Sequence, residues 1–353
     1  MQSSKSCLII GVMSGTSLDG IDIAACKFVE ENGFYTFEII KAETIPYQQH
    51  EIDALKNAFH LSGVELISLH HQYGNSIGEM VKQFCDTNHL KPDYIASHGH
   101  TIFHQPEKGF TFQLGHGANI AARAGIKTIC DFRTSDVAYG GQGAPLVPIG
   151  DELLFSEYDY CLNLGGISNI SFHENGIRKA FDVGICNMAL NELAQQANLS
   201  FDKDGLLAQS GTINQALLNM LIESAENYHA NHHSLGYEWY NKHIKTIIDK
   251  ATCSIANKLN TFCEFIAIQI TAVLQNEATV LVTGGGAKNK FLIHLLQSKC
   301  NCKIIIPEEE VIDFKEALLF AFLGILRAIE LPNSLKLVTG ASKDAIGGCI
   351  YLP

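Results

Sequence analysis

Two glycine-containing turns, each between apolar runs, constrain the fold of this chain more than any other feature. In the first half, the apolar runs Cys7–Val12 and Ile21–Val29 flank a turn at Met13–Gly20. In the second half, Tyr158–Leu164 leads into a turn at Gly165–Asn169, and another apolar run follows. A turn rich in Gly, Ser and Asp between two apolar runs is typical of a β-hairpin. The two halves share this opening without a fixed repeat period, which predicts an α/β protein of two lobes whose hairpins face one central cleft.

The remaining apolar spacing is consistent with two α/β lobes. The length of 353 residues fits two domains. We expect an N-terminal lobe of residues 1–130 plus 335–353, with the first glycine turn, and a C-terminal lobe of residues 131–334. Period-two and period-3.6 patterns predict strands at Tyr35–Lys41, Tyr94–Ser97 and Val280–Thr283, and helices at Leu66–His89, Ser254–Leu274 and Phe314–Ile329.

Composition excludes several classes of function. The net charge of −12 repels nucleic acids and anionic membranes. Eleven scattered cysteines without a C-x-x-C pair indicate reduced thiols rather than a disulfide framework or a zinc site. The longest apolar run, Ala317–Leu326, is about half of what a membrane span needs. With no signal peptide at the start of the sequence, we expect a soluble protein of the cytoplasm.

The first turn carries the residues of a phosphate-binding loop. Gly15 and Gly20 allow the backbone to turn its amides toward phosphate oxygens. Asp19 or Asp22 can hold a hydrated Mg²⁺ on the same phosphates. The spacing is close to a Walker A loop, but Ile21 stands where that motif requires lysine, and an ordinary hairpin turn is the alternative. The expected phosphate contacts are Gly15, Thr16, Ser17, Leu18, Asp19, Gly20, Ile21 and Asp22.

Two further glycine turns are candidates for nucleotide contacts. A phosphate held between two hairpins needs hydrogen-bond donors from both. The turn at Gly165–Asn169 is therefore a candidate for phosphate binding as well. A third turn follows Val280–Thr283, where backbone without Cβ would let an adenine ring lie close. Asn289 stands in that turn where a dinucleotide fingerprint requires glycine, and a tight turn without a ligand is the alternative for both segments. The expected contacts are Gly165, Gly166, Ser168 and Asn169, and Gly284, Gly285, Gly286 and Asn289.

Asp182 is the candidate for acid–base chemistry. We expect it directly before a helix, where an Asp most often serves as the N-cap. A carboxylate in that place can also accept a proton from a sugar hydroxyl or from water. The amides of the helix N-terminus would lower its pKa and keep it ionised at neutral pH. The sequence leaves capping and catalysis both open.

Three histidines and one arginine are further candidates. His98, His100 and His104 could approach one metal ion, or they could be hydrogen-bonding or core residues. Arg133 is suited to bidentate binding of a substrate carboxylate, and a salt bridge with a neighbouring Asp is the alternative. The loop Gly140–Pro145 can offer backbone donors to a sugar.

Ten motifs in a fixed order resemble the anhydro-N-acetylmuramic acid kinase family, over nearly the whole chain. The opening motif and the Gly-Gly-Gln-Gly-Ala-Pro block are the most specific. In chain order the motifs are Gly11–Asp22, His98-Gly99 with Thr101, Asp131–Arg133, Gly140–Pro148, Asn163–Asn169, Phe181-Asp182-x-Gly184-x-x-Asn187-Met188, Asp202–Gly205, Gly284–Asn289, Glu316–Ala321 and Val338–Ala341.

The resemblance implies a fold, a reaction and a set of roles. The fold would be the two-lobed, ribonuclease H-like fold of actin-like ATPases. The enzyme would use ATP and Mg²⁺ to open 1,6-anhydro-N-acetylmuramic acid with water and phosphorylate O6, in peptidoglycan recycling, and members are often homodimers. Asp182 would be the base and Asp19 a ligand of Mg²⁺. The substrate contacts would be His98, Thr101, Arg133, Gly141, Gln142, Gly143, Ala144 and Glu316.

The chain also departs from the family pattern. Val183, Ile185 and Cys186 replace Thr, Pro and Gly after the aspartate. His100 stands where the family has Gln, and Tyr237 where it has Arg. These changes motivate a second hypothesis, an ATP-binding sensor or regulator of the same fold without catalysis. A third hypothesis is a metal-dependent hydrolase that uses the three histidines.

Overall fold

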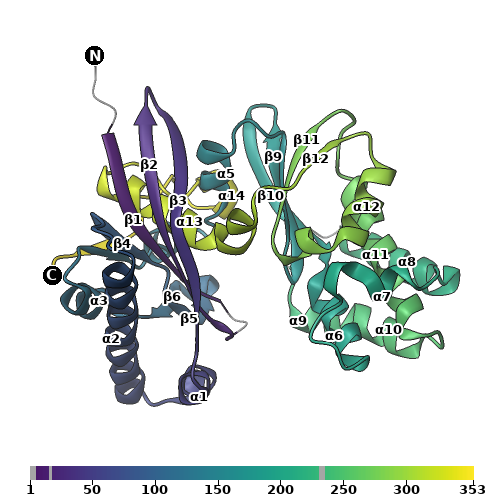
Figure 1. Cartoon of the computed structure of the whole chain (residues 1–353), viewed down its shortest axis with the longest axis horizontal. Coiled ribbons are helices and arrows are strands. Elements are labelled where there is room, and N and C mark those ends of the chain that lie inside the picture. Colours follow the sequence, from purple (N-terminus) through teal and green to yellow (C-terminus); the bar gives the residue numbers. More distant parts are fainter. Residues whose placement is uncertain (1–4, 16–17, 230–234) are drawn as a thin grey trace. The chain divides into compact units, whose positions relative to one another are not determined.

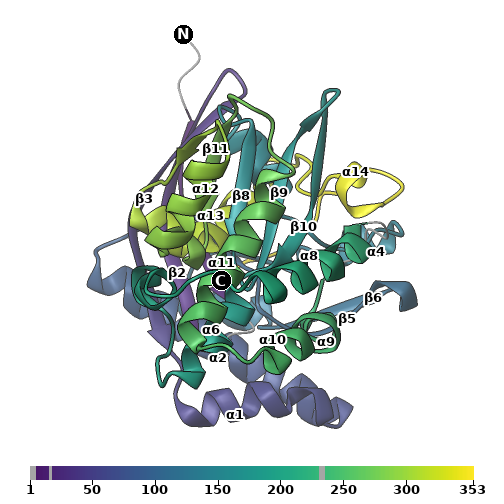
Figure 2. The ribbon, with the colours of Figure 1, turned by 90° about the vertical axis from the view of Figure 1, so that its right-hand side faces the viewer.

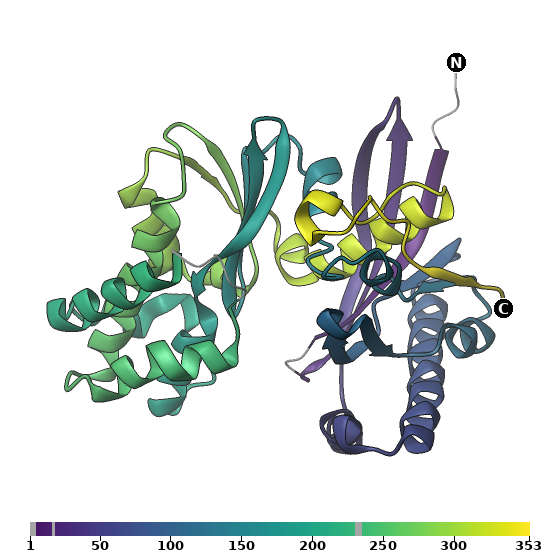
Figure 3. The same cartoon turned by 180° about the vertical axis from the view of Figure 1, so that it is seen from behind.

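A computed structural model describes residues 5–15, 18–229 and 235–353, and the chain forms two compact units. The N-terminal unit comprises residues 1–156 and 314–353, and the C-terminal unit comprises residues 157–313. The boundaries therefore differ from the expected ones at 130 and 334. Helix α5 (Pro148–Leu154) packs on β3 (Phe34–Pro46), so the segment after 130 stays with the first unit. The last segment of the chain, drawn in yellow, returns to that unit (Figure 3).

The N-terminal unit is built on a six-stranded sheet in the order β13-β7-β4-β1-β2-β3 (Figure 1). The first three strands form antiparallel hairpins, and β4 and β7 run parallel to β1. A separate two-stranded sheet pairs β5 with β6. The bounds besides β3 are β1 (Lys5–Ser14), β2 (Gly20–Glu31), β4 (Tyr94–Ser97), β5 (His100–Gln105), β6 (Phe110–Leu114), β7 (Thr128–Cys130) and β13 (Cys349–Tyr351).

Two helices cover opposite faces of this sheet. Alternate residues of β1, including Ile10 and Val12, pack with α2 (Gly63–Thr87) in one apolar core. Gly11, between them, faces α13 (Glu309–Ala328), where an added Cβ would lie 1.9 Å from the Ala317 carbonyl oxygen. The other helices of the unit are α1 (Gln49–Asn57), α3 (Gly117–Ala124), α4 (Thr134–Ala138) and α14 (Lys336–Thr339), with short 3₁₀ turns at Ala58–His60 and Pro106–Lys108.

The C-terminal unit has a five-stranded sheet in the order β10-β9-β8-β11-β12. Helix α11 packs against four helices of this unit, α6, α7, α8 and α12, and against β10 (Figure 2). The strands are β8 (Tyr160–Leu164), β9 (Ile167–Glu174), β10 (Ile177–Ile185), β11 (Thr279–Thr283) and β12 (Lys303–Ile305). The helices are α6 (Asn187–Gln196), α7 (Leu206–Gln209), α8 (Gln215–His229), α9 (Tyr237–Trp239), α10 (Thr246–Lys250), α11 (Ile255–Thr271) and α12 (Lys290–Lys299), with short 3₁₀ turns at Lys203–Gly205 and Gly285–Lys288 and a π-helical segment at Tyr240–Lys245.

The two sheets share one topology. In each, the first three strands of the unit form two antiparallel hairpins in the order third, second, first, and two parallel strands follow beside the first. This repeated arrangement is that of the ribonuclease H-like fold, and it confirms the predicted α/β class. Within the described ranges, no helix is long and apolar enough to cross a membrane.

The predicted elements are present, with shifted bounds. Strand β3 begins one residue before Tyr35 and extends five residues beyond Lys41, to Pro46. Helix α13 starts at Glu309 rather than at Phe314, and the backbone of Phe314 (φ −113°, ψ 16°) departs from helical geometry at the unit boundary.

Candidate functional site

The predicted phosphate loop joins β1 to β2 in the N-terminal unit. Thr16 and Ser17 lie outside the described residues. Leu18 has a positive φ of 58°, and its amide lies 3.5 Å from the Gly15 carbonyl oxygen. Gly20 has a packing role that the sequence did not indicate, because an added Cβ would lie 2.6 Å from the Ile45 carbonyl oxygen of β3. Asp19 is exposed to solvent beside it.

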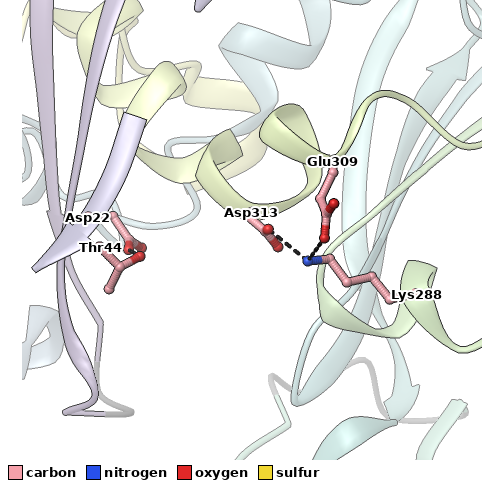
Figure 4. Close-up of polar contacts among 5 residues, drawn as sticks. All are labelled: Asp22, Thr44, Lys288, Glu309 and Asp313. Carbon is pink, nitrogen blue, oxygen red and sulfur yellow. Dashed lines mark hydrogen bonds and ion pairs between the residues drawn. The ribbon is translucent and has the colours of Figure 1, made fainter. Parts of the chain in front are cut away.

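Asp22 and Glu316 are two carboxylates of the N-terminal unit that interact electrostatically. The Thr44 hydroxyl donates a 2.6 Å hydrogen bond to Asp22 Oδ1 across β2 and β3 (Figure 4). Desolvation raises the pKa of the solvent-accessible Glu316, and the charge of Asp22 raises it further. Arg133 and Lys315 act in the opposite direction on this pKa. Hard oxygen donors with a shared negative potential are the kind of group that attracts a divalent cation.

Arg133 and His98, both predicted substrate contacts, bind each other. The Arg133 Nε–H donates to His98 Nε2 at 3.0 Å, so this nitrogen carries no proton. His98 therefore donates from Nδ1 to the Gly99 carbonyl oxygen at 2.9 Å. Burial lowers the pKa of His98 well below its usual range, and the charge of Arg133 adds to this effect. The salt bridge proposed for Arg133 with Asp131 or Asp136 does not form; its Nη1 instead donates to the Gly143 carbonyl oxygen at 2.7 Å.

The glycine-rich loop Gly140–Pro145 is fixed by a buried carboxylate. Asp136 Oδ2 accepts from the Gly143 amide at 2.8 Å, and Oδ1 accepts from the hydroxyls of Ser334 and Thr339 at 2.6 and 2.7 Å. A Cβ on Gly141 would lie 2.2 Å from the same carboxylate. The predicted contacts Gln142 and Ala144 also lie in this loop: the Gln142 amide donates to the Thr339 carbonyl oxygen at 2.8 Å, and a cis peptide bond joins Ala144 to Pro145.

The three histidines do not form a metal centre. His100 Nδ1 pairs with the Ser14 hydroxyl at 2.9 Å, and His104 Nδ1 pairs with Thr111 at 3.1 Å. Among the residues that the structure describes, no three His, Cys, Asp or Glu side chains could hold a metal ion. The hypothesis of a metal-dependent hydrolase built on these histidines is therefore wrong. The predicted contact Thr101 lies on β5, where its hydroxyl accepts from Gln113 at 3.4 Å.

Asp182 lies in the C-terminal unit, in a place that differs from the expected one. It belongs to strand β10, and helix α6 begins only at Asn187, so Asp182 is not an N-cap. It pairs with Asn169 of β9, next to a β-bulge. Its Oδ2 accepts the Leu235 amide at 3.0 Å. Burial raises the pKa of Asp182 while the Leu235 amide lowers it, so the expectation of a pKa lowered by helix amides is wrong.

The residues that depart from the family pattern after Asp182 belong to the apolar core. The bulge at Val183 follows Asp182, and Val183, Ile185 and Cys186 are all buried among core side chains. Gly184 has no room for a side chain, because an added Cβ would lie 2.4 Å from Gln269 Oε1. The changes therefore alter packing behind the strand, whereas Asp182 remains partly accessible.

Both predicted glycine turns of the C-terminal unit meet at the start of α6. The amide of Asn187 donates to the Gly165 carbonyl oxygen at 3.1 Å, and the amide of Met188 donates to that of Gly166 at 3.1 Å. In the other turn, a Cβ on Gly286 would lie 3.2 Å from Asn187 Oδ1. Asn187 thus contacts both turns; we did not single it out from the sequence, although it belongs to a motif that carries the resemblance.

Two predicted contacts use their side chains to support the fold. The Ser168 hydroxyl donates to the Gly184 carbonyl oxygen at 3.0 Å. Asn289 caps α12 by accepting the Leu292 amide at 3.0 Å. Near the Gly284–Gly286 turn, the Lys288 ammonium pairs with Glu309 at 2.8 Å and with Asp313 at 2.7 Å (Figure 4). The predicted residues thus form two groups, one in each unit.

Comparison with known sequences identifies similar proteins. A family model described as anhydro-N-acetylmuramic acid kinase matches residues 7–353. A protein of that name from Vibrio cholerae is 36% identical over 370 residues, with 98% of both chains covered. Another, from Hydrogenovibrio crunogenus, is 34% identical over 376 residues and covers 100% of both.

Solved structures are more distantly similar. Component A of the (R)-2-hydroxyglutaryl-CoA dehydratase of Acidaminococcus fermentans is 12% identical with a TM-score of 0.45, covering 89% of this chain and 96% of that one. The ROK hexokinase from Thermus thermophilus is 11% identical with a TM-score of 0.35, covering 92% of this chain and 100% of that one.

Proposed function

The chain belongs to the anhydro-N-acetylmuramic acid kinase family, and from this we propose that it uses ATP and water to convert 1,6-anhydro-N-acetylmuramic acid to N-acetylmuramic acid 6-phosphate. The reaction would serve the recycling of peptidoglycan. The structural observation that supports it most is the placement of Asp182 at a β-bulge, with its neighbour Val183 turned into the core. Bulges next to active sites re-aim side chains in this way.

In the proposed mechanism, Asp182 acts as a general base. Its carboxylate takes a proton from a water molecule, and the water oxygen forms a bond to the anomeric carbon of the sugar. The bond between that carbon and O6 breaks, and O6 attacks the γ-phosphorus as the bond to ADP breaks. Burial raises the pKa of Asp182, which makes the carboxylate a stronger base while the Leu235 amide limits the rise. A base of this kind contributes about 10²- to 10⁴-fold to the rate.

We propose that Gly15–Asp22 bind the phosphates of ATP and that Gly284–Gly286 bind its adenosine side. Phosphoryl transfer depends on positioning and charge neutralisation. Asp22 and Asp19 would hold Mg²⁺, and the oxygen donors here fit that ion because Mg²⁺ usually takes one or two carboxylates, with waters and phosphates completing its shell. When bound, the ion neutralises phosphate charge.

The N-terminal group of residues would bind the sugar. Arg133 is oriented by His98 and by the Gly143 carbonyl oxygen, so its guanidinium is pre-organised for the lactyl carboxylate of the substrate. Burial lowers the pKa of Arg133 to about 10, and the charge of Glu316 opposes this, so the guanidinium remains cationic at neutral pH. Gly141, Gln142, Gly143 and Ala144 would offer backbone groups to the sugar, and Thr101 and Glu316 would contact it through their side chains.

We also propose that the protein is a cytoplasmic homodimer. All eleven cysteines are free thiols, which is usual in a reducing compartment. The dimer rests on the family resemblance alone, and light scattering during size-exclusion chromatography tests it. No specific observation favours the catalytically impaired sensor, because the departures after Asp182 lie in the core.

Asp182→Asn tests the function, with Asp249→Asn as a matched control on an exposed carboxylate of the same unit. We expect Asp182→Asn to lose about 10²- to 10⁴-fold in kcat while ATP binding persists. Mass spectrometry of the products would show an anhydro sugar that has gained both water and a phosphoryl group, in the wild type and in the control. Unchanged turnover in Asp182→Asn would remove this residue from the mechanism. ATP binding without any sugar phosphate in the wild type would favour the sensor.

A further inference from the structure

Asp182 is the first of three polar residues that lie side by side across the sheet of the C-terminal unit. It is directly opposite Asn169 in the antiparallel pair of β10 and β9. Asn169 is in turn directly opposite Asn163 in the antiparallel pair of β9 and β8. Directly opposite residues of such a pair point to the same face of the sheet, with their Cβ atoms about 4.5–5.5 Å apart. The three side chains therefore form one row, in the order Asp182, Asn169, Asn163.

This row lies on the face of the sheet that points away from the apolar core of the unit. The neighbours of the row members along the strands belong to that core: Leu162, Leu164, Ile170 and Val183. Successive residues of a strand point to opposite faces, so the row members point the other way. Each of the three is partly accessible to solvent. The row can therefore contact a bound molecule.

The side-chain amide of Asn169 is not used to hold the fold together. Among residues 5–15, 18–229 and 235–353, neither its Oδ1 nor its Nδ2 has a hydrogen-bond partner. Asn289, another predicted contact of the same unit, differs in this respect because its Oδ1 accepts the Leu292 amide. A partly accessible amide without a partner in the fold can donate and accept hydrogen bonds with a ligand or with water.

The other end of the row lies at the glycine turns. A Cβ on Gly284 would lie 2.5 Å from Asn163 Oδ1, and a Cβ on Gly165 would lie 3.2 Å from Asn163 Nδ2. The Asn163 amide is therefore next to both turns that are expected to contact the nucleotide. Asn169 stands between this amide and Asp182, so it lies between the proposed nucleotide turns and the proposed base.

The position of Asn169 beside Asp182 fits the water molecule of the proposed reaction. The two side chains are cross-strand neighbours without a direct hydrogen bond between them, and a water molecule often bridges polar groups in this arrangement. The attacking water has two O–H bonds and needs a lone pair directed at the anomeric carbon. Asp182 accepts one O–H bond and takes its proton, and the oxygen of an amide can accept the other. With both O–H bonds held, the direction of the lone pairs is fixed.

We propose that Asn169 is a second catalytic residue, whose Oδ1 accepts the other O–H bond of the attacking water and so directs a lone pair at the anomeric carbon. The water oxygen bonds to that carbon as the bond from the carbon to O6 breaks, and O6 takes the γ-phosphoryl group from ATP. One water proton passes to Asp182, and the other stays on the new hydroxyl group. This inference rests on the proposed reaction with Asp182 as its base. It gives Asn169 a role other than the phosphate contact expected from the sequence.

Asn169→Leu tests this role, because leucine is similar in size to asparagine and has no polar atom. The measurements are kcat for sugar phosphate formation and, by calorimetry, the Kd of the anhydro sugar and of a non-hydrolysable ATP analogue with Mg²⁺. We expect kcat to fall about 10- to 100-fold, because a water that is no longer oriented reacts more slowly. Both Kd values should change by less than about threefold, which also shows that the variant is folded. Asn219→Ala, at an exposed amide on α8, is the control and should match the wild type.

The possible results separate this role from others. An unchanged kcat in Asn169→Leu would overturn the inference. A weakened affinity for the ATP analogue with kcat retained would also overturn it, because Asn169 would then contact the phosphates. An inactive Asp182→Asn beside a fully active Asn169→Leu would remove only Asn169 from the mechanism. A wild type that forms no sugar phosphate would instead overturn the proposed function itself.

Asn169→Asp and Asn163→Asp test the arrangement of the row. A carboxylate at 169 would stand next to Asp182, and one at 163 would be about 10 Å away, because neighbouring strands are about 4.8 Å apart. A like charge raises the pKa of Asp182, and the effect falls with distance. We expect the acidic limb of kcat/KM for the sugar, at saturating ATP, to move up by about one pH unit in Asn169→Asp and by about half as much in Asn163→Asp. A purely structural role of Asn169 would not produce this gradient, and equal shifts or no shift would overturn the inference.

Discussion

Replacing Asp136 should destabilise the N-terminal unit strongly, although this residue is not among the proposed contacts. Its carboxylate is completely buried and accepts three hydrogen bonds, from the Gly143 amide and from the hydroxyls of Ser334 and Thr339. Hydrogen bonds to a charged group contribute about 1.5–3 kcal/mol each. In Asp136→Ala the two hydroxyls can rotate toward other acceptors, but the Gly143 amide cannot. We therefore expect a loss of about 3–5 kcal/mol in the free energy of unfolding.

The variant Asp136→Asn gives a graded test. Its carbonyl oxygen can still accept from both hydroxyls, whereas its amide would face the Gly143 N–H, so one donor opposes another. The expected loss is about 2–3 kcal/mol. The measurement is urea unfolding followed by circular dichroism, with hydrogen exchange of Gly140–Pro145 to locate the effect. Asp86→Asn, at an exposed site on α2, is the control and should change stability by less than about 0.5 kcal/mol. A loss below about 1 kcal/mol in Asp136→Ala would refute the view that this carboxylate anchors the loop.

Two further predictions concern pH and backbone conformation. Burial and the neighbouring His116 and His71 lower the pKa of His70 from 6.5 to about 4, so the unfolded chain binds the proton first and stability falls as pH drops from 6.5 toward 4. Because His70 is only partly buried, we expect the free energy of unfolding to fall by about 1 kcal/mol between about pH 7 and about pH 4.5. The fall should be smaller in His70→Gln, whose side chain does not titrate. Equal falls in the two proteins, measured by urea unfolding, would contradict this prediction. Gly284→Ala should lower the free energy of unfolding by about 2–4 kcal/mol, measured by thermal or urea unfolding. Gly284 has a φ of 78°, and an added Cβ would lie 2.5 Å from Asn163 Oδ1. Gly285→Ala is the control and should be tolerated, because its Cβ would meet only an ordinary contact at 3.7 Å.

The strands and turns were predictable because their signal is local. Apolar alternation and Gly-rich turns place β1, β2, β8 and β9 correctly, and the three-to-four-residue spacing gives α2. The unit boundary was not predictable in this way. Residues 131–156 have no composition that marks them as a linker or as part of either unit, and only the packing of α5 on β3 decides where they belong.

The partners of the site residues were also beyond sequence reasoning. Arg133 was expected to pair with a neighbouring Asp, but it binds His98, 35 positions earlier, because β4 ends close to the residue that follows β7. Asp136 is 198 positions from Ser334 and still shares a hydrogen bond with it. The local sequence pattern does not predict such contacts, because they depend on which strands become neighbours in the sheet.

The location of Asp182 shows how a local rule can mislead. An Asp shortly before a helical pattern favours an N-cap, yet here β10 continues through Gly184 and Ile185 before α6 begins. Strand alternation would place Asp182 and Gly184 on one face and Val183 on the other, and the bulge changes the register between Asp182 and Gly184 while Val183 remains in the core. A residue at 183 is therefore selected by the volume of the core rather than by the chemistry of the carboxylate. This explains how the chain can depart from the family pattern at 183, 185 and 186 and still keep a partly accessible aspartate at 182.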